Sequence, residues 1–140
     1  ETATIRQGLA QLPDTHDAVR QSLIEVGVCM LRFLLEPHVL AVERVMSHQG
    51  EQHPKLLRAF FDAGPWAISQ WLREKLEGLA SAGHLSLPDP ARAADQLCSM
   101  WQGMLIKEVR MGVRTSPSDE ELKQQIISAV DVFLAAYGRR

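Results

Sequence analysis

The histidines, cysteines and carboxylates are the residues of this sequence that could do chemistry, through a metal ion or an activated nucleophile. His48 and His53 flank a predicted loop and could share a metal, but no cysteine or further ligand set lies nearby. No glutamate has a histidine three positions later, the pairing by which helical bundles hold two irons. Phosphate-binding glycine loops, nucleophile elbows and HExxH motifs are absent as well. The sequence therefore predicts no metal, no other cofactor and no enzymatic activity.

Methionine and aromatic side chains are concentrated on the three longest predicted helices, around Gly64-Pro65. At helical spacing such residues usually form plain core, and that interpretation stays open. A kinked helix leaves a gap in the packing, however, and gaps between bundle helices are common ligand sites. We therefore expect a pocket for an apolar or aromatic molecule, with Glu25, Arg32 and Gln102 as the nearest polar contacts. Its candidate lining residues are Leu23, Val26, Met30, Phe33, Phe60, Phe61, Trp66, Leu97, Trp101 and Met104.

Apolar residues recur at helical spacing along almost the whole chain, and no stretch alternates as a half-buried strand would. The pattern predicts an all-α bundle of about six helices. We expect them at residues 2–12, from a cap at 14 or 15 to 36, 37–48, 54–82, 90–112 and 122–137. Gly64-Pro65 should kink the fourth helix without breaking it, because the apolar period resumes beyond the proline. Ser118 and Glu121 are spaced as a capping box for the last helix.

The last two predicted helices carry apolar residues over unusually wide arcs. Two such helices cannot both be central to one small core, so we expect them to pack against a second copy of the chain. The alternative is that one of them is merely central. Gly103 would permit a close backbone approach there, or is a neutral interior glycine. The predicted interface residues are Gln102, Ile106, Val109, Val113, Ile127 and Leu134.

Length and charge narrow the class of protein further. The 140 residues and 15.6 kDa fit a single domain over residues 1–140. The formal net charge is −2, with both signs interspersed, which argues against a surface that binds nucleic acid. Cys29 and Cys98 lie in apolar helical runs, and no secretory or membrane-spanning segment is present. We therefore expect reduced thiols in a cytoplasmic protein.

Several segments together resemble the C-terminal domain of TetR-family transcriptional regulators. They keep their order over residues 18–138, and they are 60–65 (FFDAGP), 83–85 (GHL), 89–90 (DP) followed by Ala93 and Ala94, and 130–138 (VDVFLAAYG). The resemblance implies a helical domain that binds a small effector and dimerises through its last two helices.

The resemblance also implies a part that this sequence does not contain. In the family, an N-terminal helix-turn-helix domain binds operator DNA, and none is present here. The helix at residues 1–12 would then be the connector leading out of that domain. By resemblance the intact protein is a repressor, whereas this chain alone should contact no nucleic acid. The alternative, from a different class, is a helical homodimeric scaffold without a ligand pocket.

Overall fold

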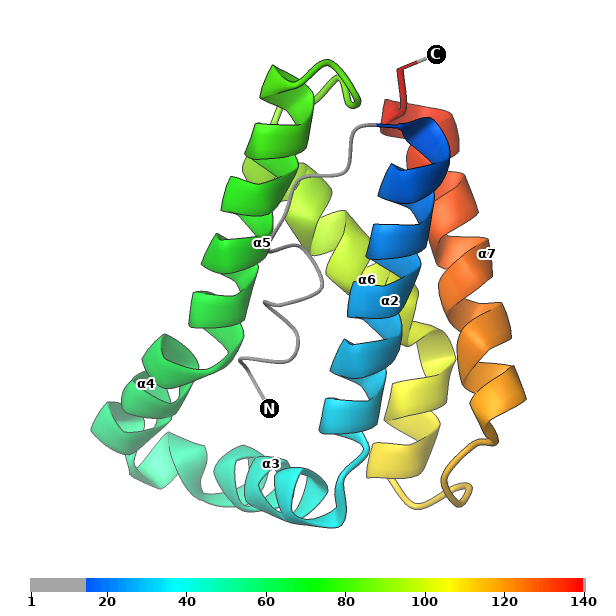
Figure 1. Ribbon diagram of the computed structural model, residues 1–140. Coiled ribbons are helices and arrows are strands. Elements are labelled where there is room, and N and C mark those ends of the chain that lie inside the picture. Colours follow the sequence, from blue (N-terminus) through cyan, green and yellow to red (C-terminus); the bar gives the residue numbers. More distant parts are fainter. Residues whose placement is uncertain (1–14, 140) are drawn as a thin grey trace.

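The computed structural model describes residues 15–139 as a bundle of α-helices (Figure 1). The elements are α2 (His16–Leu34), α3 (Pro37–Gln49), a 3-10 turn η1 (Gly50–Gln52), α4 (Pro54–Ala63), α5 (Pro65–Ser81), α6 (Pro90–Arg110) and α7 (Asp119–Tyr137). Within these residues there is no strand, only an isolated bridge between Leu85 and Gly138. The all-α prediction is confirmed. The predicted connector helix at 2–12 lies outside the described residues.

Side-chain caps fix where the helices begin. Ser118 and Glu121 form the predicted capping box of α7, in which each side chain bonds the other residue's backbone amide. Asp89 accepts a 3.1 Å hydrogen bond from the Arg92 amide at the start of α6, and Thr15 caps α2 in the same way. These local bonds satisfy amides that the first helical turn leaves unpaired. The predicted caps of these helices therefore agree with the structure, although α7 begins at Asp119 and not at Leu122 as predicted.

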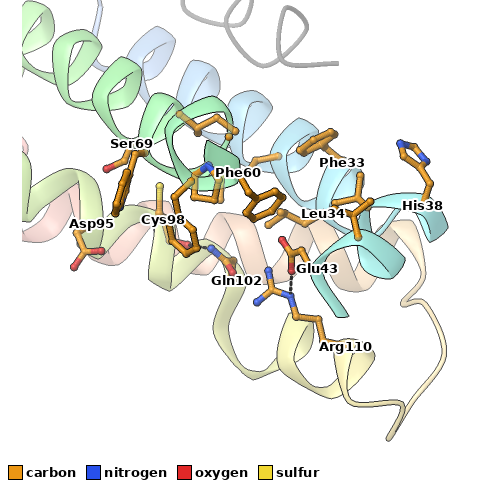
Figure 2. Close-up of a pocket in the computed structure, with 18 residues that line it drawn as sticks. Phe33, Leu34, His38, Glu43, Phe60, Ser69, Asp95, Cys98, Gln102 and Arg110 are labelled. Carbon is orange, nitrogen blue, oxygen red and sulfur yellow. Dashed lines mark hydrogen bonds and ion pairs between the residues drawn. The ribbon is translucent and has the colours of Figure 1, made fainter. Parts of the chain in front are cut away.

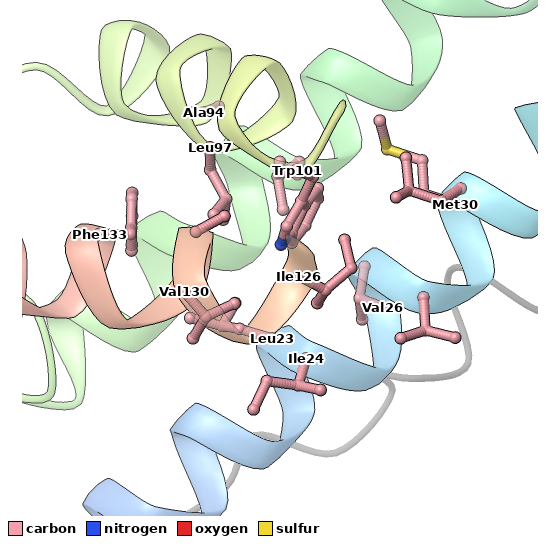
Figure 3. Close-up of a cluster of buried hydrophobic side chains, with 14 of the residues drawn as sticks. Leu23, Ile24, Val26, Met30, Ala94, Leu97, Trp101, Ile126, Val130 and Phe133 are labelled. Atoms are coloured by element: carbon pink, nitrogen blue, oxygen red, sulfur yellow. The ribbon is translucent and has the colours of Figure 1, made fainter. Parts of the chain in front are cut away.

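The core lies where α2, α5, α6 and α7 meet (Figures 1 and 3). Trp101 is at its centre, and its indole ring packs on the backbone of α2 at Gly27, where only a residue without a side chain leaves room. The described core holds no buried polar or charged residue. Its other fully buried large side chains are Leu23, Leu31, Leu72, Leu76, Leu79, Leu85, Leu97, Ile106 and Phe133.

The expected kinked helix over residues 54–82 is instead two helices, so that prediction was wrong. Gly64 separates α4 from α5 with φ −121° and ψ −93°, which are not helical values. Pro65 has no amide hydrogen and disfavours helical geometry at the residue before it. Because the helix is interrupted at Gly64, α4 does not continue along the axis of α5 but turns away from it (Figure 1). No residue of α4 is buried.

A second departure from the expected geometry lies inside α6. Gly103 has φ 52° and ψ −153°, a conformation open essentially to glycine alone, and it kinks the helix there. The sequence predicted a continuous helix at this point. The kink lets the Gln125 side chain of α7 approach Gly103 so closely that an added Cβ would lie 2.6 Å from Gln125 Nε2.

No helix within residues 15–139 combines the length and the apolar character needed to cross a membrane.

Candidate ligand-binding pocket

A pocket of about 740 Å³ opens between α2, α3, α4, α5 and α6 (Figure 2). It lies where α4 turns away from α5, and Gly64, which separates the two helices, is one of the residues that line it. Its lining is mainly apolar. The lining residues are Met30, Phe33, Leu34, His38, Val39, Val42, Glu43, Phe60, Phe61, Gly64, Pro65, Trp66, Ile68, Ser69, Asp95, Cys98, Gln102 and Arg110.

Aromatic rings line one wall of the pocket. The ring centroids of Phe61 and Trp66 lie 5.2 Å apart, and those of Phe60 and Phe61 lie 5.9 Å apart. The Arg58 guanidinium lies 5.7 Å from the centre of the Trp66 ring. Edge-to-face and tilted contacts of this kind hold the rings in place. They present flat apolar surface to whatever enters the pocket.

An ion pair between α3 and the end of α6 provides the polar end of the pocket. Arg110 Nε lies 2.6 Å from Glu43 Oε2, as Figure 2 shows. The Arg110 backbone carbonyl also accepts a 3.2 Å hydrogen bond from Arg44 Nε. The only buried residue of α3 is Leu40. The contacts with α6 therefore help to hold α3 in position beside the pocket.

Neutral polar groups lie deeper along α6. Gln102 Nε2 donates a 3.2 Å hydrogen bond to the Cys98 carbonyl. Burial, together with the charge of nearby Asp95, raises the pKa of the Cys98 thiol to about 12. The thiol is therefore protonated near neutral pH and is no nucleophile. Within residues 15–139, no group of three or more histidine, cysteine or carboxylate side chains could hold a metal ion.

The residues predicted to bind a ligand divide into three groups in the structure. Five of them line the pocket: Met30, Phe33, Phe60, Phe61 and Trp66. Four belong to the solid core and do not line it: Leu23, Val26, Leu97 and Trp101 (Figure 3). Met104 lies outside the pocket with 66% of its surface exposed.

Of the three polar residues expected beside the pocket, which are Glu25, Arg32 and Gln102, only Gln102 lines it. Gln102 was also among the residues predicted at a subunit interface. Glu25 instead accepts a hydrogen bond from Gln21 on the surface, and Arg32 forms a 3.7 Å ion pair with Asp119. Glu43 and Arg110 were missed, because nothing local to either residue marks them as partners.

The other residues predicted at a subunit interface are in large part used inside this chain. Ile106, Val109 and Leu134 are buried within the subunit, and Ile127 is half-buried against its core. Val113, by contrast, is 75% exposed. The apolar arcs of α6 and α7 are thus shared between the core of this subunit and its surface.

Comparison with known proteins identifies the family. The family model described as "AefR-like transcriptional repressor, C-terminal domain" matches residues 21–139. The chain belongs to this family. The chain is therefore the C-terminal domain of a TetR-family transcriptional regulator, as the resemblance predicted. Among curated proteins, none matches its sequence significantly.

Two solved structures show the same fold. A protein described as a TetR-family transcriptional regulator from Mesorhizobium loti superposes with a TM-score of 0.86 at 20% identity, over 99% of this chain and 66% of that protein. The flavonoid-responsive regulator FrrA superposes with a TM-score of 0.80 at 26% identity, over 99% of this chain and 71% of FrrA. The chain thus spans about two thirds of the length of these regulators.

Proposed function

We propose that the chain is the ligand-sensing and dimerisation domain of a TetR-family repressor, and that its pocket binds an apolar or aromatic effector. The observation that carries this is the pocket of about 740 Å³ with Phe60, Phe61 and Trp66 along its wall. Pockets of this size and lining are typical of small-molecule sites. A structural relative, FrrA, is described as responsive to flavonoids, which are aromatic molecules.

We propose further that the intact regulator binds operator DNA in the cytoplasm through a helix-turn-helix domain outside this chain, to which residues 1–12 connect. In this proposal the chain itself contacts no nucleic acid. A homodimer would form along α6 and α7. Exposed apolar side chains on or beside these helices support that surface: Met104, Met111, Val113 and Val132.

The geometry of α6 suggests how an effector would influence the dimer. Asp95, Cys98 and Gln102 line the pocket before the kink at Gly103, and Arg110 lines it after the kink. A bound molecule would therefore contact both halves of the bent helix. If it fits one bend better than another, it shifts the population of α6 conformers by that difference in affinity. Because α6 also carries the proposed dimer surface, the shift would reach the partner subunit.

The test is calorimetric titration of the chain with a panel of flavones and smaller aromatic molecules. We expect saturable binding of one molecule per subunit. Phe61→Ala removes a ring from the pocket wall and should weaken binding about tenfold or more. Leu56→Ala, on the exposed side of the same helix, is the matched control and should leave binding unchanged. The alternative, a dimeric scaffold without a ligand site, predicts no saturable binding across the panel.

A further inference from the structure

The pocket has few charged groups, and their signs do not favour an anion. Glu43 and Asp95 are the carboxylates that line it, and Arg110 is the guanidinium. His38 also lines it and lies 3.3 Å from Glu36 Oε2. An anionic ligand would therefore meet at least as much negative as positive charge in the lining.

The guanidinium of Arg110 is already engaged. Its Nε is 2.6 Å from Glu43 Oε2, and the Glu43 side chain is only 20% exposed. A ligand carboxylate that displaced Glu43 from Arg110 would leave Glu43 without its partner in a partly dehydrated site, and one that bound beside Glu43 would meet an arginine whose charge is already compensated. Removing one partner of such a pair costs more than the pair itself contributes, because the remaining charge is left uncompensated. The pocket thus opposes a carboxylate even though it contains an arginine.

Neutral hydrogen-bonding groups remain accessible in the same place. The Gln102 amide uses its nitrogen to bond the Cys98 carbonyl, which orients its oxygen. Among the described residues, no donor bonds Gln102 Oε1. Ser69, which carries a hydroxyl, lines the pocket as well. Groups of this kind bind a hydroxyl or an amide of a ligand without requiring a charge.

We propose that the effector is an uncharged aromatic molecule with a hydroxyl or amide donor, which meets Gln102, and that the Glu43–Arg110 pair excludes carboxylates. The inference rests on the proposed function and specifies the chemical class of its ligand. It assigns Glu43 a role in specificity. The Glu43 carboxylate compensates the charge of Arg110, which would otherwise attract acidic molecules.

The first experiment compares two probes that differ in charge alone, a flavone carboxamide and the flavone carboxylate with the same substitution. Calorimetric titration of the unmodified chain near neutral pH should give at least about tenfold tighter binding of the carboxamide. Equal affinities, or tighter binding of the carboxylate, would overturn the inference. No substitution is involved, so the result does not depend on how a variant folds.

The second experiment removes the charged partner of Arg110. Glu43→Gln keeps the shape of the side chain but removes its charge, so Arg110 becomes free to pair with a ligand. The carboxylate should gain at least about tenfold in affinity, with little change for the carboxamide. Glu74→Gln, at an exposed position of α5 that does not line the pocket, is the control. A gain equal to that of the control would contradict the role of Glu43.

The two proposals fail in different ways. If both probes bind equally well and Phe61→Ala weakens both, the ligand-sensing function stands and the selection against anions is wrong. If neither probe binds to the folded chain, the proposed function loses its support and this inference falls with it. Circular dichroism melting curves of each variant establish that the compared proteins are folded.

Discussion

The side-chain amide of Gln125 in α7 donates a 2.8 Å hydrogen bond to the backbone carbonyl of Met100 in α6. In an uninterrupted helix this carbonyl would accept from the amide of Met104, but Gly103 breaks the helical geometry between them. Gln125 therefore satisfies a group that the kink releases. The bond couples the bend of α6, which borders the pocket, to the neighbouring helix.

Replacing Gly103 by alanine should destabilise the domain strongly. The new Cβ would meet Gln125 Nε2 at 2.6 Å, and the backbone conformation is unfavourable for any residue with a side chain. We expect a loss of about 2–4 kcal/mol in the free energy of unfolding, measured by urea denaturation. Gly112→Ala is the matched control, since Gly112 also has a positive φ but open space around it. It should cost about 1 kcal/mol; similar losses at both glycines would contradict the proposed role of the Gln125 contact.

Gly27→Ala tests the packing of Trp101 on α2. A Cβ at residue 27 would lie 2.6 Å from Trp101 Nε1, inside the core. We expect a net loss of about 1–2 kcal/mol, because the overlap outweighs the ~1 kcal/mol that alanine adds in helix propensity. In the double variant with Trp101→Phe, the smaller ring should relieve the overlap, so the two losses should sum to more than the measured total. Additive losses would show that the two sites do not interact.

The ion pair between Arg20 and Asp131 should make stability depend on pH. Arg20 Nε lies 2.8 Å from Asp131 Oδ1, and hydrogen bonding to Arg20 lowers the pKa of the Asp131 carboxyl below its ordinary 3.8. The pair therefore stabilises the fold above that value, and its contribution is lost as pH falls through the lowered pKa.

Asp131→Asn measures this contribution. Both side chains are substantially exposed, so at pH 7 the loss should be at most about 1 kcal/mol. At a pH below the lowered pKa of Asp131, the variant and the unmodified chain should converge. Urea denaturation at both pH values checks this, with Asp62→Asn on the exposed surface of α4 as the control. A loss that persists in acid would show that packing, and not the ion pair, is responsible.

The proposed dimer predicts which substitutions give folded monomers. Met104 and Val132 are 66% and 56% exposed, so an aspartate at either should leave the subunit folded and weaken the association. Sedimentation of these variants should show monomers, and circular dichroism should show unchanged helicity. Val45→Asp, on α3 and 50% exposed, should remain dimeric. An unchanged dimer in both interface variants would reject this surface. Ile106→Asp should instead unfold the subunit, because Ile106 is buried within it.

The sequence by itself determined the local features of this protein. Helical periodicity and short-range caps such as Ser118 with Glu121 depend on residues a few positions apart, so they predicted the all-α class and most helix starts. The ordered segments that resemble TetR-family C-terminal domains predicted the family. The sequence also identified five aromatic or methionine residues that line the pocket. Bulky apolar side chains near a predicted proline kink can be recognised from the order of the residues alone.

Only the tertiary structure decided how those features are combined. Trp66 and Trp101 have equal hydrophobic character, yet Trp101 fills the core against Gly27 whereas Trp66 borders a pocket. The pairing of Glu43 with Arg110 and the support of the Gly103 kink by Gln125 likewise join residues far apart in the chain. Such contacts depend on where distant helices meet in space. Hydrophobicity is not directional, so the sequence pattern marks which side chains avoid water but not which neighbours they find.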